Sequence, residues 1–187
     1  MKPSIFLATL FAIITEANPA SITGRKPRFG PLPEGSGDGW YEGSLLPNGN
    51  TEWSYLGPKQ SQSQRRGVEI TSSVTKAILD GPPSGDAYFC SGWKVKAKDA
   101  EEAVEGFAGL CGNGRRFESV MAYAVGTAVA YGCSYGNPGV TCAHGAYNAT
   151  GFLRGLQHAC GKGNTGFFFL AKEAVSYGVS NLRDYYC

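Results

Sequence analysis

The chain has 187 residues, with 17 Lys and Arg against 15 Asp and Glu, six cysteines and two histidines. This near balance of charge argues against a nucleic acid as partner, because binding to a phosphate backbone depends on clustered basic residues. The cysteines contain no Cys-x-x-Cys pair, so a zinc site built on them is not expected. We therefore predict no metal and no cofactor.

The N-terminus has the pattern of a secretory signal peptide. Lys2 gives a positive start, residues 5–14 (IFLATLFAII) form an apolar run, and residues 15–17 (TEA) end it with two small residues around a glutamate. The run is much shorter than the ~20 residues of a membrane-spanning helix. We predict that residues 1–17 are removed and that the product is secreted to the extracellular space.

Residues 18–66 have the composition of a flexible leader, rich in Gly, Pro, Ser and Asn and poor in aliphatic side chains. One island within it, residues 38–57 (DGWYEGSLLPNGNTEWSYLG), alternates aromatic and turn residues. It predicts a β-hairpin that turns at Pro47, Asn48 and Gly49. Two strands alone are marginally stable in water, so this hairpin needs another surface to pack against.

Arg65 and Arg66 mark the end of the leader. All six cysteines follow this pair, and the net charge lies before Gly67, with seven basic against five acidic residues there and ten against ten after it. A dibasic pair in an accessible segment of a secreted precursor suits a kexin-type processing protease. A solvated pair of surface charges is the alternative. We predict cleavage after Arg66, which makes 18–66 a removable propeptide and 67–187 a single domain.

The order of elements within 67–187 is strand, helix, strand, helix, strand, strand. Strands are predicted at 87–92, 119–131, 166–170 and 174–187, and helices at 98–114 and 146–160. Asp99 is expected to cap the first helix, with Glu102 closing a capping box. The order predicts an α+β fold, a two-layer α/β-sandwich in which both helices cover one face of a small, mostly antiparallel sheet.

Each predicted helix has one apolar face. The faces comprise Ala103, Val104, Phe107, Leu110 and Cys111 in the first helix, and Phe152, Leu153, Leu156 and Cys160 in the second. The run FFFL at 167–170 is expected to be a buried strand, whereas exposed phenylalanines there would indicate a lipid or partner surface. Asn148 begins an N-glycosylation sequon.

An even number of cysteines in a secreted chain predicts three disulfides, whose pairing the sequence alone leaves open. The cysteines occur in AYFCSG (87–92), LCGNG (110–114), the close pair Cys133 and Cys142, LQHACG (156–161) and YGVSNLRDYYC (177–187). With the strand-like SVMAYAV at 119–125, this order resembles the killer-protein-four toxins of fungal viruses and related small secreted fungal effectors. The chain lacks the additional cysteines of those toxins.

The resemblance implies an α/β-sandwich with disulfides Cys90–Cys160 and Cys111–Cys187, which leaves Cys133 with Cys142. Toxins of that family are non-enzymatic and are thought to act on calcium uptake by target cells, with a basic residue near the start of the central strand taking part. That neighbourhood here holds Arg115 and Arg116. Their contact with a target is a hypothesis. The alternative is a solvated pair that favours the negative end of the preceding helix.

We therefore expect a disulfide-stapled fungal virulence effector or killer-toxin-like protein that binds a target-cell or host protein, including a membrane-associated one. The main alternative is a small secreted hydrolase, in which His144 and His158 would serve as ribonuclease-like acid and base. Residues 67–187 lack the basic stripe that such an enzyme needs. A third possibility is a non-toxic cell-wall or matrix protein.

Overall fold

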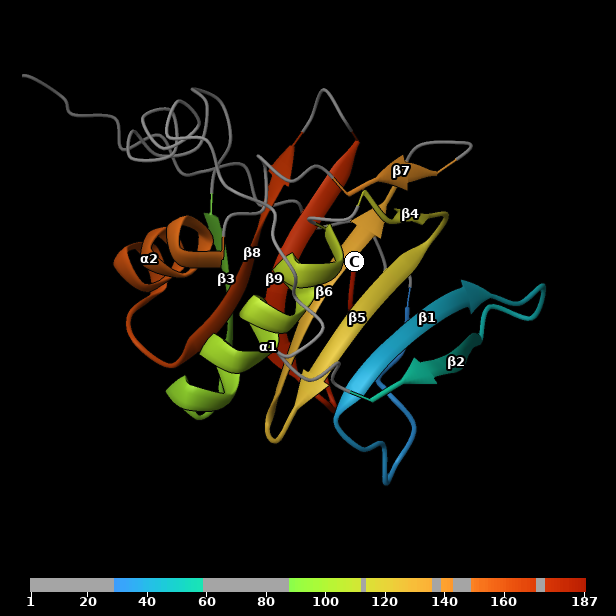
Figure 1. Cartoon of the computed structure of the whole chain (residues 1–187), viewed down its shortest axis with the longest axis horizontal. Coiled ribbons are helices and arrows are strands. Elements are labelled where there is room, and N and C mark those ends of the chain that lie inside the picture. Colours follow the sequence, from blue (N-terminus) through green and yellow to red (C-terminus); the bar gives the residue numbers. More distant parts are fainter. Residues whose placement is uncertain (1–28, 59–87, 112–113, 136–138, 143–148, 171–173) are drawn as a thin grey trace, which may run out of the picture.

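The structure is a computed structural model that describes residues 29–58, 88–111, 114–135, 139–142, 149–170 and 174–187 (Figure 1). The predicted signal peptide, Arg65, Arg66, His144 and Asn148 lie outside the described residues. What was predicted for them therefore stays a prediction.

Strands dominate the described chain. In chain order the elements are β1 (Gly39–Leu45), β2 (Thr51–Gly57), β3 (Tyr88–Lys94), α1 (Ala97–Cys111), β4 (Arg116–Phe117), β5 (Val120–Val125), β6 (Ala128–Ser134), β7 (Val140–Thr141), α2 (Ala149–Cys160), β8 (Asn164–Leu170) and β9 (Val175–Asn181). Seven of these strands form one sheet in the order β2-β1-β5-β6-β9-β8-β3, and β4 pairs with β7 in a second, two-stranded sheet. Neighbouring strands of the large sheet run antiparallel. The predicted α+β class with a mostly antiparallel sheet is confirmed.

The hairpin predicted at 38–57 is present and belongs to the large sheet. β1 pairs with β2 on one side and with β5 on the other, so that Trp40 lies opposite Tyr123. Trp40 and Tyr41 are buried on opposite faces of the sheet, in two separate cores. The flexible leader expected from composition is therefore wrong for residues 29–58, because a few large aromatic side chains supply the burial that the average composition conceals.

The single strand predicted at 119–131 is a hairpin instead. β5 ends at Val125, and the chain turns at Gly126, whose φ of 53° suits glycine. The backbone N–H and the hydroxyl of Thr127 each donate a hydrogen bond of 2.7 Å to the Asp99 carboxylate. These bonds, that of the hydroxyl first, hold the pKa of Asp99 below its usual value. Because α1 begins at Ala97, Asp99 lies in its first turn and fastens the helix to this hairpin.

The buried residues of both helices belong to one core cluster with residues of the large sheet. The predicted apolar faces are largely confirmed: Ala103, Val104, Phe107 and Cys111 of α1 and Phe152 and Leu156 of α2 are buried, while Leu110, Leu153 and Cys160 are partly buried. Two helix glycines allow this close packing. A Cβ atom at Gly106 would collide with the Tyr123 ring, and one at Gly155 with the Tyr88 ring.

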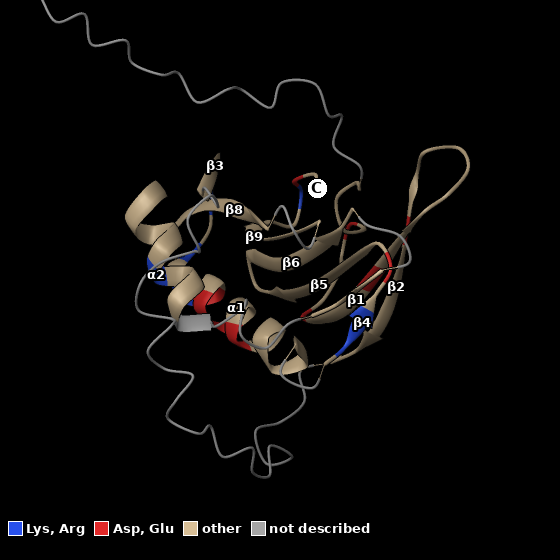
Figure 2. Cartoon of the chain, turned by 90° about the horizontal axis from the view of Figure 1, so that it is seen from above, with Lys and Arg blue, Asp and Glu red and all other residues tan. Residues whose placement is uncertain are grey.

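The opposite face of the sheet is covered by the two ends of the described chain. The N–H of Phe29 donates to the carbonyl of Tyr186 at 3.1 Å, and the N–H of Tyr186 donates to the carbonyl of Phe29 at 2.9 Å. Both side chains pack with Tyr131 and Val129 in a second core. The C-terminus accordingly lies across the sheet from the helices (Figure 2).

This arrangement makes the N-terminal hairpin an integral part of the fold although it contains no cysteine. We predict that a chain cut at a specific protease site placed at residues 61–66 keeps its two pieces together. They should co-elute in native size-exclusion chromatography and separate in denaturant without reductant. Elution of the N-terminal piece alone under native conditions would show that residues 29–58 are a dissociable leader.

Candidate functional site

On the sheet face opposite α1, the second core covers β1, β5 and β6, and among the described residues a pocket of about 450 Å³ lies beside this core, toward β8 and β3. Seven aromatic residues line it: Phe89, Trp93, Tyr131, Tyr135, Phe167, Phe169 and Tyr185. Ser91, Ser176, Asp184 and Cys187 complete the lining. We call this site the aromatic pocket. Its volume is within the range typical of small-molecule sites, roughly 300 to 1,000 Å³.

Strand β8 divides the FFFL run between two surfaces. Phe168 and Leu170 are buried in the core beneath the helices, as predicted for a buried strand. Phe167 and Phe169 point to the opposite face and are only half-buried. Phe167 stacks on Phe89 of β3 with ring centroids 5.1 Å apart, and Phe169 meets Tyr135 edge-on at 5.6 Å. Because successive side chains of a strand point to opposite faces, two residues of this run line the pocket and two are buried in the core.

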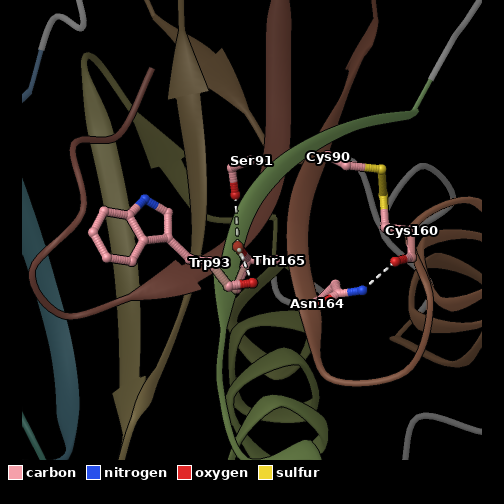
Figure 3. The surroundings of a disulfide bond; sticks show 6 residues. All are labelled: Cys90, Ser91, Trp93, Cys160, Asn164 and Thr165. Atoms are coloured by element: carbon pink, nitrogen blue, oxygen red, sulfur yellow. Dashed lines mark hydrogen bonds between the residues drawn. A yellow bond between two sulfur atoms is a disulfide. The ribbon is translucent and has the colours of Figure 1, made fainter.

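Strand β3 is the sheet edge that forms one wall of the pocket. Figure 3 shows Cys90 directed toward its disulfide partner Cys160 in α2, while the Trp93 ring points away from that disulfide. The hydroxyls of Ser91 and Thr165 lie 2.6 Å apart, and the Thr165 hydroxyl donates to the Trp93 carbonyl at 3.1 Å. The disulfide and these bonds fix the strand, although 47% of Trp93 remains exposed.

The C-terminal tail forms the opposite wall. β9 ends at Asn181, so the strand predicted through residue 187 is wrong beyond that point. One carboxylate oxygen of Asp184 accepts a hydrogen bond from the Ser180 hydroxyl, and the other accepts one of 2.8 Å from the N–H of Tyr185. Tyr186 is fully buried, whereas Tyr185 is 58% exposed. Tyr186 therefore anchors the tail in the core, and Tyr185 is exposed to solvent.

The disulfides correct the pairing that the family resemblance implied. Cys90 bonds to Cys160 as implied, but the other two bridges are Cys111–Cys142 and Cys133–Cys187. Cys111 and Cys142 belong to the core beneath the helices, and Cys133 and Cys187 to the core on the opposite face. A bond between Cys111 and Cys187 would have to pass through the sheet, so the strand register excludes it.

Asp184 is the only ionisable acid or base among the side chains that line the pocket, apart from the phenols. Burial raises the pKa of the Tyr131 phenol far above its usual value, and the nearby Tyr135 and Asp184 raise it further. The floor of the pocket is therefore neutral. Among the described residues no group of three His, Cys, Asp or Glu side chains is placed to hold a metal ion. The Asp184 carboxylate and the surrounding aromatic rings offer a charged group and apolar surface with which the pocket could contact a ligand.

The residues singled out from the sequence lie elsewhere. The Arg115 guanidinium is 3.6 Å from the Glu42 carboxylate of β1, and Arg116 is an exposed residue of β4. β4 lies at the other end of the large sheet from β3 (Figure 2). A target contact through this pair remains a hypothesis. His158 is exposed in the last turn of α2, on the helix side of the sheet.

Comparison with known proteins finds no matching family model, no similar curated protein and no similar solved structure. The helices of the described chain are too short or too polar to cross a membrane. The site must therefore be interpreted from its own geometry.

Sequence reasoning missed the aromatic pocket, although a signal for it was present. In YFCSGW, residues 88–93, Phe89 and Trp93 are four residues apart, and in FFFL Phe167 and Phe169 are two apart, so an extended chain places each pair on one face. Two such runs on neighbouring strands place a row of rings on one face of the sheet. Nothing in the sequence showed that β3 and β8 are neighbours, since 70 residues separate Cys90 from its partner Cys160.

The Cys133–Cys187 bridge should hold the wall of the pocket in place. Replacing both with alanine is expected to reduce the free energy of unfolding by about 4 kcal/mol at most, because the bridge closes a loop with a sequence separation of 54. Urea unfolding measures this change. Peptide mapping of the non-reduced wild-type protein should recover Cys133 linked to Cys187, and a peptide linking Cys111 to Cys187 would contradict the assigned pairing.

Proposed function

We propose that this chain is a secreted, non-enzymatic effector or killer-toxin-like protein, and that it acts by binding a target at or outside another cell through the aromatic pocket. The observation that supports it most is the exposure of Trp93 and Tyr185, 47% and 58%, at the rim of a preformed apolar cavity. Large aromatic side chains beside a pocket are the usual anchors of binding sites.

The rigidity of the walls supports the same proposal. The Cys90–Cys160 bridge holds β3 against α2, and the Cys133–Cys187 bridge holds the tail against β6. The rings of Phe89 and Phe167 are stacked, which leaves them little freedom to lose on binding. A site that is already ordered pays a smaller entropic penalty on binding, because its side chains need not be immobilised.

Three disulfides fit an oxidising compartment and thereby support the proposal of secretion. The further proposal of a killer-protein-four-like two-layer sandwich is supported by the order of elements, by the shared core of both helices with the sheet, and by the Cys90–Cys160 bridge. The proposed partners are a target-cell or host protein, including a membrane-associated one, and a kexin-type protease that acts at Arg65 and Arg66.

Binding of the labelled, secreted protein to intact fungal and plant cells tests this function. The double variant with Trp93→Ala and Tyr185→Ala should bind at least about tenfold more weakly, because truncating an anchor residue typically removes about 2 kcal/mol or more. Its unfolding midpoint should change little, since both side chains are about half exposed.

Tyr55→Ala is the matched control, because Tyr55 is 52% exposed on β2, outside the pocket. This variant should bind cells like the wild type. Equal binding by the pocket double variant, or no cell binding by the wild type, would contradict the proposal. RNA cleavage by the wild type that is lost in His158→Ala would favour the hydrolase instead.

A further inference from the structure

The chemical character of the aromatic pocket narrows the class of ligand that it takes. The π electrons give each aromatic ring a partial negative charge on its two faces. These faces attract a cation that lies within about 6 Å of the ring centroid. Phe89 and Trp93 come from β3, Phe167 comes from β8 and Tyr185 comes from the C-terminal tail. Aromatic rings therefore border the cavity from several directions. Such an arrangement favours a positively charged group with an apolar surface.

The formal charge of the pocket lining also favours a positively charged ligand. Asp184 is half-buried, and its carboxylate is held by two neutral donors, the Ser180 hydroxyl and the N–H of Tyr185. In the described part of the chain no Lys or Arg forms an ion pair with it. Arg183 and Lys94 adjoin residues of the lining in the sequence, but both are exposed and neither lines the pocket. Among the described residues, Asp184 therefore gives the cavity a negative charge and no cation lines it.

The hydrogen bonds within the β3 wall leave one hydrogen-bond acceptor, the Ser91 hydroxyl oxygen, available to a ligand. A hydroxyl has one proton, and that of Thr165 is given to the Trp93 carbonyl. Ser91 must then donate its own proton to Thr165, so that the Ser91 oxygen has only lone pairs left to offer. The Ser91 oxygen can therefore accept a hydrogen bond from an O–H or N–H group carried elsewhere on a ligand, such as the hydroxyl of an amino alcohol.

From these three features we propose that the aromatic pocket binds an organic cation of the methylated or quaternary ammonium class, with Trp93 and Tyr185 contacting its methyl groups and Asp184 supplying the opposite charge. This inference rests on the proposed binding function of the same pocket. A cavity of about 450 Å³ is larger than a trimethylammonium group. The cation is therefore the head of a larger molecule, of which choline is the simplest representative.

Choline chloride and 3,3-dimethylbutan-1-ol form the matched pair of probes, because the alcohol has the same shape without the charge. Titration of the full secreted chain, followed by NMR, should show choline binding at least about tenfold more tightly than the alcohol, as expected for a desolvated cation–π site. Asp184→Asn should weaken choline binding severalfold and leave the alcohol unaffected. Tyr185→Leu, which keeps an apolar side chain without a π face, should also weaken choline binding.

The outcomes separate the two proposals. Equal affinities for choline and the alcohol, unchanged choline binding in Asp184→Asn, or no choline binding at millimolar concentration would overturn the cation proposal. Each of these outcomes is compatible with cell binding that depends on Trp93 and Tyr185, in which case the pocket takes a ligand of another class or recognises a cation without Asp184. If the double variant with Trp93→Ala and Tyr185→Ala binds cells as tightly as the wild type, the proposed function itself is overturned. Near-UV circular dichroism of each variant checks that the fold is retained.

Discussion

The backbone pairing of Phe29 with Tyr186 brings the two ends of the described chain together across the sheet face opposite α1. β5 and β6 are buried on both faces, so without these ends a large apolar surface would meet water. The Cys133–Cys187 bridge fixes the same tail covalently. Among the described residues this cover stops at the tail, and the aromatic pocket lies at that boundary, over β8 and β3.

Buried residues and residues that line the pocket alternate along the chain around it. In the tail, Tyr186 fills the second core and Tyr185 is presented to solvent. In β8, Phe168 packs beneath the helices and Phe167 faces the pocket. The two-residue period of extended chain lets one segment stabilise the fold and line the site. Substitutions of the outward set should therefore change binding more than stability.

Some of this could be predicted from the sequence. The apolar faces of both helices and the hairpin at 38–57 were predicted because local periodicity and turn residues encode them. The β5–β6 hairpin was missed because its strands are apolar on both faces and show no period, with Gly126 as the only break. The partners of Cys111 and Cys133 depend on which face of the sheet each one occupies, and strand register decides that. The pocket itself requires contacts between β3 and β8, which no local pattern contains.

Binding at the aromatic pocket requires that the pocket be open in the full chain. Photochemically induced dynamic nuclear polarization detects the Trp and Tyr rings that a dissolved dye can reach, and it measures this accessibility directly. We predict strong polarization of Trp93 and Tyr185 and none of Trp40 or Tyr186, which are buried. Absence of polarization at both Trp93 and Tyr185 would show that the pocket is covered, and would contradict its assignment as a binding site.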